Sequence, residues 1–149
     1  MKLVILDRDG VINVDSAEFI KSADEWKPIP GSLEAITRLN HAGYHVVVAT
    51  NQSGIGRGLF EVAALNTIHD KMHKALAHMG GRIDAVFFCP HAQEADCNCR
   101  KPRPGLLEEI AHRFNTELDG VPSDFTAIRV AEDCRSLTEP LATHFGRKV

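Results

Sequence analysis

The sequence predicts an α/β fold with a mostly parallel sheet, in a single domain covering residues 1–149. Two runs of aliphatic and β-branched residues, 3–6 and 45–50, each end in polar residues, as buried parallel strands do. A stretch with helical periodicity separates the two runs, and a connection of this length is typical of a right-handed βαβ unit. A chain of 149 residues is large enough to bury a core.

The composition is that of an ordinary globular protein. Hydrophobic residues make up 44% of the chain and charged residues 25%, and the net charge is −3. Without a basic excess to neutralise phosphates, we expect no nucleic-acid partner. No apolar run approaches the roughly 18 residues of a membrane span. The first apolar run stops at Asp7, too early for a signal peptide, so we expect a cytoplasmic protein with no membrane partner.

The first strand is followed by Asp7-Arg8-Asp9-Gly10, which places two carboxylates two residues apart. Ligands of open α/β sheets bind outside the carboxyl ends of the strands. One carboxylate there can be a nucleophile or metal ligand, and the other a proton donor and acceptor. Gly10 permits the turn that separates them. For this tetrapeptide alone, a polar strand exit that happens to contain two aspartates is the alternative.

Residues 11–30 are expected to form an irregular flap over the end of the first strand. Asp15 and Glu18 could face a polar substrate from this flap, or could be solvated loop carboxylates. A helix should then begin near Ser32, a suitable N-cap residue, and end at Gly43. Its apolar stripe consists of Leu33, Ile36 and Leu39.

The second strand leads into residues 50–58, which are rich in hydroxyl, amide and glycine residues. Side-chain donors and unhindered backbone N–H groups at such a strand end can converge on an oxyanion. The spacing is not that of a P-loop. Three glycines in five residues could also be turn chemistry alone.

A long amphipathic helix is predicted from residue 62 to about 79, followed by a third strand at 84–88. The apolar positions of the helix recur at steps of three and four: Val62, Leu65, Ile68, Met72, Leu76 and Met79. We assign its three histidines, His69, His73 and His78, to the solvated face. Another helix should begin after Pro104, with an apolar face formed by Leu106, Leu107, Ile110 and Phe114.

The loop at 89–99, directly after the third strand, contains a complete ligand set for zinc. The pattern C-x-H-x5-C-x-C is formed by Cys89, His91, Cys97 and Cys99. Three thiolates and one imidazole make a closed tetrahedral site with no position for water, so we expect a structural role. Clustered cysteines in a reducing compartment are more often metal ligands than disulfides. Four unligated residues near a strand end are the alternative.

Arg100 and Lys101 follow the last of these cysteines directly. A metal clamp that ends at Cys99 would fix the position of both cations. Lysine as a point charge beside arginine as a fork of donors suits a phosphate site.

In these segments the sequence resembles the haloacid-dehalogenase superfamily of aspartate-dependent phosphatases. Within it, the match is to the D-glycero-D-manno-heptose 1,7-bisphosphate phosphatases. The matching motifs are residues 7–13, 49–54, 89–91 and 97–102, and the resemblance runs from residue 1 to about Pro122. It implies a Rossmann-like, three-layer HAD fold without a cap domain, acting on a sugar phosphate for lipopolysaccharide biosynthesis. We expect a monomer.

The resemblance also implies a role for each residue of the site. Asp7 would attack phosphorus and become an aspartyl phosphate, while Asp9 would protonate the leaving sugar oxygen and later deprotonate water. Thr50 and Lys101 would stabilise the transferring phosphoryl group. Magnesium would be bound by the Asp7 carboxylate and the Asp9 backbone carbonyl. The residues implied in substrate binding are Asp15, Ser16, Ala17, Glu18, Asn51, Gln52, Ser53 and Arg100.

The histidinol-phosphate phosphatases share these motifs and the zinc loop, so the motifs alone do not separate the two substrates. Histidinol phosphate is therefore the alternative substrate.

The resemblance fails after Pro122, in the atypical tail 123–149. The family should continue into a Gly-Asp-Ser-x-x-Asp segment, whose first aspartate binds magnesium, and the tail has no Gly-Asp pair. Residues 128–133 look like the family's last strand, which predicts an internal deletion of a few tens of residues. Glu132 or Asp133 in the metal position is the alternative. With this ligand lost, the chain could be a poor phosphatase or a zinc-stabilised, non-catalytic remnant.

Overall fold

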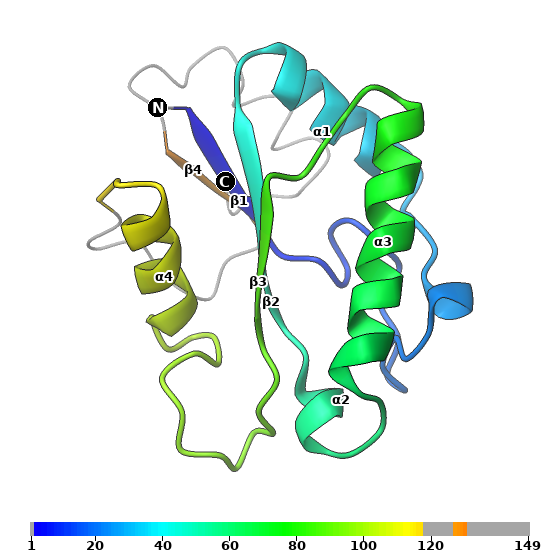
Figure 1. Ribbon diagram of the computed structural model, residues 1–149, viewed down its shortest axis with the longest axis vertical. Coiled ribbons are helices and arrows are strands. Elements are labelled where there is room, and N and C mark those ends of the chain that lie inside the picture. Colours follow the sequence, from blue (N-terminus) through cyan, green and yellow to red (C-terminus); the bar gives the residue numbers. More distant parts are fainter. Residues whose placement is uncertain (1, 118–126, 131–149) are drawn as a thin grey trace.

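The computed structural model describes residues 2–117 and 127–130 of the chain. The strands are β1 (Leu3–Leu6), β2 (His45–Asn51), β3 (Ala85–Cys89) and β4 (Ala127–Val130). The helices are α1 (Ser32–His41), α2 (Ser53–Gly56), α3 (Val62–His78) and α4 (Gly105–Arg113), with a 3-10 turn η1 (Ala23–Glu25). Among the described residues, the strands form one sheet in the order β3-β2-β1-β4 (Figure 1).

The sheet is mostly parallel, as the sequence predicts. β1 pairs in parallel with β2, and β2 in parallel with β3. The exception is β4, which is antiparallel to β1, with Ala127 opposite Leu6 and Val130 opposite Leu3. β4 therefore begins beside the carboxyl end of β1 and ends beside its amino end. The predicted strand near residue 128 is confirmed, whereas Glu132 and Asp133 lie outside the described residues.

Helices cover both faces of the sheet, which gives the three layers expected of the fold (Figure 1). On one face, alternate residues of β1 and β2, such as Val4 and Val46, pack in one buried cluster with apolar residues of α1 and α3. On the other face, Leu3 and Val47 pack with the apolar side of α4. Because both faces are covered, these strands are apolar throughout rather than alternating.

The segment 11–30 is irregular, as expected, and its apolar residues pack into the core. Val11, Ile12, Ile20 and Trp26 are buried in the same cluster as α1 and α3. Lys71 of α3 donates hydrogen bonds to two carbonyls of this segment, those of Ala23 (2.7 Å) and Trp26 (2.9 Å). The segment therefore contributes to the core, because its apolar residues are too numerous to stay in solvent.

The N-cap expected at Ser32 is wrong. Gly31 occupies the cap position, and the buried Ser32 hydroxyl donates instead to the carbonyl of Ile12 at 2.7 Å. That bond satisfies a carbonyl of the turn after β1, which a local view of the helix could not foresee. The predicted end is confirmed, since α1 stops just before Gly43, whose φ is 90°.

The amphipathic pattern of α3 is confirmed in its interior and not at its ends. Val62 and Met79 are 43% and 39% exposed, whereas four residues between them are fully buried: Leu65, Ile68, Met72 and Leu76. The assignment of His69 to the solvated face is wrong, since it is buried at 7% exposure. His78 is exposed and His73 half-buried. No described helix is both long and apolar enough to cross a bilayer.

Leu76→Ala should lower the free energy of unfolding by about 2–5 kcal/mol, because it leaves a cavity under α3. Val62→Ala, on the exposed first turn of the same helix, should stay within about 0.5 kcal/mol of wild type. Urea unfolding at constant m-value measures both changes. Equal losses for the two variants would contradict the burial of this face.

Candidate active site

A tight turn after β1 places the two aspartates of the first motif. The carbonyl of Arg8 accepts backbone N–H groups from Val11 (3.1 Å) and Ile12 (2.8 Å), and Gly10 adopts a φ of 80°. Such a φ strains any residue with a Cβ, so glycine is the suitable residue here. The turn separates the environments of the Asp7 and Asp9 carboxylates.

Asp7 pairs with Lys101. The Nζ atom of Lys101 lies 3.1 Å from Oδ1 of Asp7 and donates to the carbonyl of Ala49 at 2.8 Å. Burial raises the pKa of Asp7, and the charge of Lys101 opposes this rise. Burial also lowers the pKa of Lys101, and the charge of Asp7 opposes that change. Each charge therefore stabilises the other in a partly desolvated site, beside a 28% exposed carboxylate that a ligand can reach.

Asn51 holds the backbone of Lys101. Its Nδ2 donates to the Lys101 carbonyl at 3.1 Å, and its Oδ1 accepts the Lys101 N–H at 2.9 Å. This reciprocal pair joins the end of β2 to the segment that follows the cysteine loop. Asn51 is a predicted substrate residue, and the structure shows that its amide also positions the backbone of the lysine.

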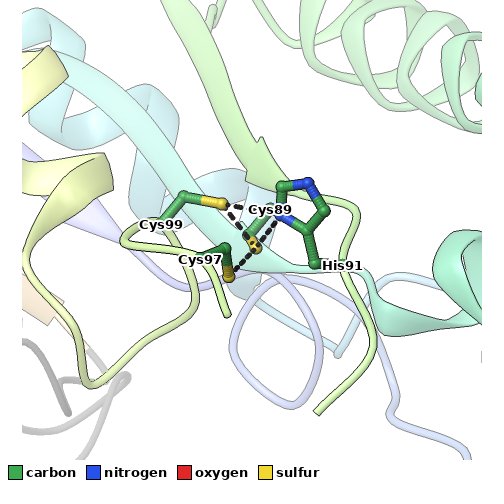
Figure 2. A group of neighbouring side chains, drawn as sticks. All are labelled: Cys89, His91, Cys97 and Cys99. Carbon is green, nitrogen blue, oxygen red and sulfur yellow. Dashed lines mark hydrogen bonds between the residues drawn. The ribbon is translucent and has the colours of Figure 1, made fainter. Parts of the chain in front are cut away.

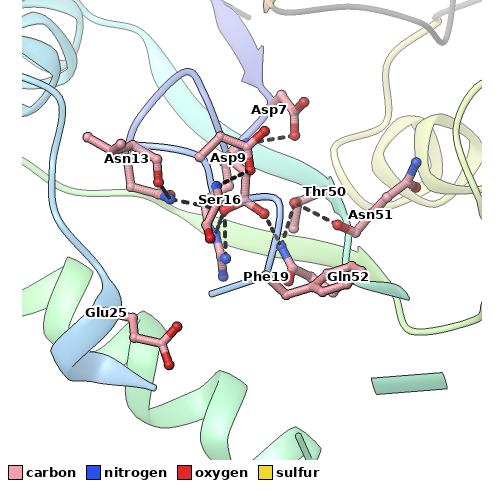
Figure 3. Close-up of polar contacts among 12 residues, drawn as sticks. Asp7, Asp9, Asn13, Ser16, Phe19, Glu25, Thr50, Asn51 and Gln52 are labelled. Atoms are coloured by element: carbon pink, nitrogen blue, oxygen red, sulfur yellow. Dashed lines mark hydrogen bonds and ion pairs between the residues drawn. The ribbon is translucent and has the colours of Figure 1, made fainter. Parts of the chain in front are cut away.

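Asp9 is held by four side-chain donors. Its Oδ1 accepts from Nε and Nη2 of Arg8, at 2.9 and 2.7 Å, and from Nδ2 of Asn13 at 3.0 Å. Its Oδ2 accepts from Nε2 of Gln52 at 3.1 Å, and the same nitrogen lies 2.9 Å from Oγ1 of Thr50 (Figure 3). Gln52 is only 3% exposed, so its amide links Asp9 to Thr50.

The other expected substrate residues lie on two sides of this centre. Asp15, Ala17 and Glu18 are exposed, and Ser16 is partly buried. Ser16 connects its neighbours locally: its N–H donates to Asp15, and its hydroxyl accepts from the N–H of Glu18. The remaining two, Ser53 and Arg100, are buried and half-buried.

Two further contributors, Arg8 and His69, were not predicted. Arg8 is fully buried, and its Nη1 lies 3.1 Å from Nε2 of His69. A signal for His69 was present in the sequence. It lies four residues after Leu65, on the stripe that also contains Met72.

The oxygen donors at the end of β1 fit magnesium. Lys101 and the N–H of Arg8 both contact Oδ1 of Asp7, and the side chain is 28% exposed, so it can offer an oxygen to a metal. Carboxylate and backbone carbonyl oxygens are the ligands that magnesium takes in proteins. Asp7 and the carbonyl of Asp9 therefore supply a suitable, although partial, ligand set.

The four predicted zinc ligands come together. Figure 2 shows the side chains of Cys89, His91, Cys97 and Cys99 turned toward one another, and their ligand atoms all lie within 4.8 Å of one another. The sulfur atoms of Cys89 and Cys97 are 3.8 Å apart. That separation is about the edge of a tetrahedron around zinc with Zn–S bonds of about 2.3 Å.

The ionisation of these thiols shows why the cluster suits a cation. Burial and the neighbouring Cys89 raise the pKa of Cys99, so a second thiolate is unfavourable without a positive charge. Zinc binds thiolates and supplies that charge. The cluster is therefore a fitting Cys3His site for zinc.

Gly56 lies against the backbone of this loop. A Cβ there would come within 2.5 Å of the Ala92 nitrogen and 2.8 Å of the Pro90 carbonyl oxygen. Its N–H donates to that same carbonyl at 2.8 Å. At least this glycine of 50–58 serves close packing between α2 and the zinc loop.

Comparisons with known proteins agree with this site. The family model described as Polynucleotide kinase 3 phosphatase matches residues 2–126. A D-glycero-beta-D-manno-heptose-1,7-bisphosphate 7-phosphatase of Bordetella bronchiseptica is 59% identical over 129 residues, which cover 87% of this chain and 72% of that protein. The chain belongs to this phosphatase family, among the heptose bisphosphate phosphatases. The resemblance seen in the sequence is confirmed.

Two further relatives of the family support the assignment. The phosphatase of the same name from Neisseria meningitidis serogroup A is 56% identical over 78% of this chain and 63% of its own length. A crystal structure of the B. bronchiseptica D,D-heptose 1,7-bisphosphate phosphatase, complexed with magnesium and phosphate, has a TM-score of 0.78 at 61% identity. The aligned region covers 81% of this chain and 68% of the crystallised chain. The chain thus spans between three-fifths and three-quarters of these relatives.

The purified chain should contain one zinc ion, held by the four ligands of the loop. Cys97→Ser should abolish stoichiometric zinc and lower the Tm, because a three-ligand site no longer closes the loop. Metal analysis and thermal unfolding measure this. The matched control is Cys134→Ser, at the one cysteine outside the motif, which should keep zinc. A zinc-free wild type would refute the site.

His69 should make the protein more sensitive to acid. Burial, with the charge of Arg8, lowers the pKa of His69 from 6.5 to about 3. Below pH 6.5 the unfolded chain takes up a proton at this residue that the folded chain does not. Folding stability from this group is thus complete above pH 6.5 and falls by about 1.4 kcal/mol per pH unit as the pH drops toward 3.

Between pH 6 and 4.5 the wild type should therefore lose about 2 kcal/mol more stability than His69→Gln. Urea unfolding of both proteins across this range measures the difference. Parallel stability curves would show that His69 is not kept neutral by the fold.

Proposed function

We propose that this chain removes the C7 phosphate of D-glycero-D-manno-heptose 1,7-bisphosphate through an aspartyl-phosphate intermediate. The observation that carries the proposal is the pairing of Asp7 with Lys101 at 3.1 Å, next to a separately held Asp9. The chain is also 59% identical to a Bordetella phosphatase of that name. The product would enter lipopolysaccharide precursor synthesis.

In the first step, an oxygen of the Asp7 carboxylate attacks phosphorus and the bond to the sugar oxygen breaks. Asp9 gives its proton to the departing oxygen. In the second step, Asp9 takes a proton from water, which attacks phosphorus and releases phosphate and free Asp7. Two carboxylates with different surroundings can divide the work of nucleophile and acid–base in this way.

Charge neutralisation is the main requirement, because an anionic carboxylate must meet an anionic phosphate. The Lys101 ammonium lies at the carboxylate and can contact the phosphoryl group as it transfers. Thr50, linked through Gln52 to Asp9, would donate from the end of β2. Magnesium bound by Asp7 and the Asp9 carbonyl would neutralise further charge on the phosphoryl group.

Substrate recognition would combine the exposed loop 15–18 with Arg100, the residue that follows the zinc loop. Nη1 of Arg100 has no hydrogen-bond partner in the described part of the chain, and a small turn of the half-buried guanidinium group would bring this donor to a phosphate oxygen. Asp15 lies against the Gly10 turn, from where the exposed loop 15–18 would meet sugar hydroxyls. Ser53, beside Gln52, would complete this pocket.

We also propose that the enzyme is a cytoplasmic monomer that binds neither nucleic acid nor membrane. The net charge of −3 provides no basic excess for phosphate backbones. Cys89, Cys97 and Cys99 are free thiols, and a thiolate metal site is typical of a reducing compartment.

A second candidate, a zinc-stabilised protein without catalysis, is favoured by the direction of β4. β4 ends at Val130, which lies opposite Leu3 at the amino end of β1, whereas Asp7 follows the carboxyl end of β1. None of the four described residues of β4 has an oxygen-bearing side chain, so β4 itself supplies no further magnesium ligand beside Asp7. The tail also lacks the Gly-Asp pair.

Phosphate release from heptose 1,7-bisphosphate and from histidinol phosphate, at saturating magnesium, separates these candidates. We expect turnover of the heptose substrate, slower turnover of histidinol phosphate, and a loss of about 10³-fold or more in Asp7→Asn, because the nucleophile is gone. Unchanged zinc content is the control for folding.

Three results would change the assignment. Faster turnover of histidinol phosphate than of the heptose bisphosphate would make histidinol phosphate the assigned substrate. A folded, zinc-loaded wild type that releases no phosphate from either ester would favour the non-catalytic protein. An Asp7→Asn variant as fast as wild type would overturn the mechanism.

A further inference from the structure

We propose that His69 of α3 is a positioning residue for Asp9, acting through the guanidinium group of Arg8. The inference rests on the proposed function, in which Asp9 is the acid and base. It concerns a helix residue that is 61 positions away from Arg8 in the sequence and is buried at the back of the site.

The guanidinium group of Arg8 is shared between two partners. Its Nε and Nη2 both donate to Oδ1 of Asp9, at 2.9 and 2.7 Å, and its Nη1 lies 3.1 Å from Nε2 of His69. Arg8 is fully buried, so a donor that lost its partner would not be compensated by water. The two contacts therefore fix the guanidinium plane together.

The contact requires neutral His69. Arginine can only donate, so Nε2 of His69 must be the unprotonated acceptor and Nδ1 must carry the proton. The charged and titratable groups around the ring are Arg8, His73 and Asp9, and burial together with Arg8 keeps the pKa of His69 at about 3. The histidine thus remains an acceptor at neutral pH.

The consequence for Asp9 is a choice between its two oxygens. Oδ1 accepts three hydrogen bonds, two from Arg8 and one from Asn13, whereas Oδ2 accepts one from Gln52. Oδ2 is then the oxygen that can hold and transfer the proton. If the guanidinium group turned, Oδ1 would lose two of its three hydrogen bonds and the carboxylate would be less firmly oriented.

The support behind His69 is rigid. Its neighbours on the buried stripe of α3, Leu65, Ile68 and Met72, have no exposed surface. His69 therefore extends the core of the protein to the acid–base group through a single intervening side chain. Misplacement of a reacting group by about 1 Å can slow catalysis about 100-fold.

The test compares His69→Leu, which keeps the bulk but not the acceptor, with His69→Gln, whose amide oxygen can accept from Nη1. His78→Leu, on the exposed end of the same helix, is the control. Single-turnover phosphoryl transfer is measured with heptose bisphosphate, whose alkoxide needs the Asp9 proton. It is also measured with p-nitrophenyl phosphate, whose leaving group does not.

For His69→Leu we expect a loss of about 10- to 100-fold with the sugar phosphate and less than about threefold with the aryl phosphate. His69→Gln should recover most of the sugar rate, and His78→Leu should match wild type. Equal losses on both substrates would mean a merely structural role and overturn the proposal. So would full activity in His69→Leu, or a failure of folded His69→Gln to recover.

A measurement without turnover separates this proposal from the proposed function. In 15N NMR, the Arg8 Nε–H signal should be protected from exchange in wild type and His69→Gln, and lost in His69→Leu. A wild type that hydrolyses neither ester would refute the proposed function. The NMR signal would still test whether His69 positions Arg8, because it does not depend on turnover. Equal protection in all three proteins would overturn it.

Discussion

The contact between Lys101 and Asp7 is the interaction on which the site depends. The Lys101 ammonium group contacts the Asp7 carboxylate after β1 and the Ala49 carbonyl of β2. It therefore joins two strands near their carboxyl ends, where the reaction is proposed. Burial works against both charges, and neither would remain ionised as readily without the other. A phosphate group that approaches Asp7 would meet the positive charge of Lys101, which is already held in position.

The chain has two separate means of holding that lysine. Asn51 binds its backbone with two hydrogen bonds, and the metal loop ends two residues before it, at Cys99. Polar loops have too few apolar residues to settle into one shape, and a metal can replace the missing core. Zinc bound by this loop would limit where the Lys101 ammonium group can lie.

Asp9 is held by a different set of side chains. Its donors come from the turn after β1 and from the end of β2, and the key donor, Arg8, contacts His69 of a core helix. Asp7, the proposed nucleophile, is thus contacted from the zinc-loop side, and Asp9, the proposed acid and base, is supported from the α3 side. Two nearby carboxylates thus have different surroundings, as the two tasks proposed for them require.

Much of the molecule follows from local pattern. The sequence alone determined the α/β class, the buried strands, the interior of the helical stripes and the Cys/His cluster, because apolar period and residue spacing are local properties. Only the tertiary structure decided that Ser32 bonds to Ile12, that Asn51 binds the backbone of Lys101, and that His69 meets Arg8. It also decided the reversed direction of β4. Such partners are distant in the chain, and a buried polar group takes whichever partner packing brings to it.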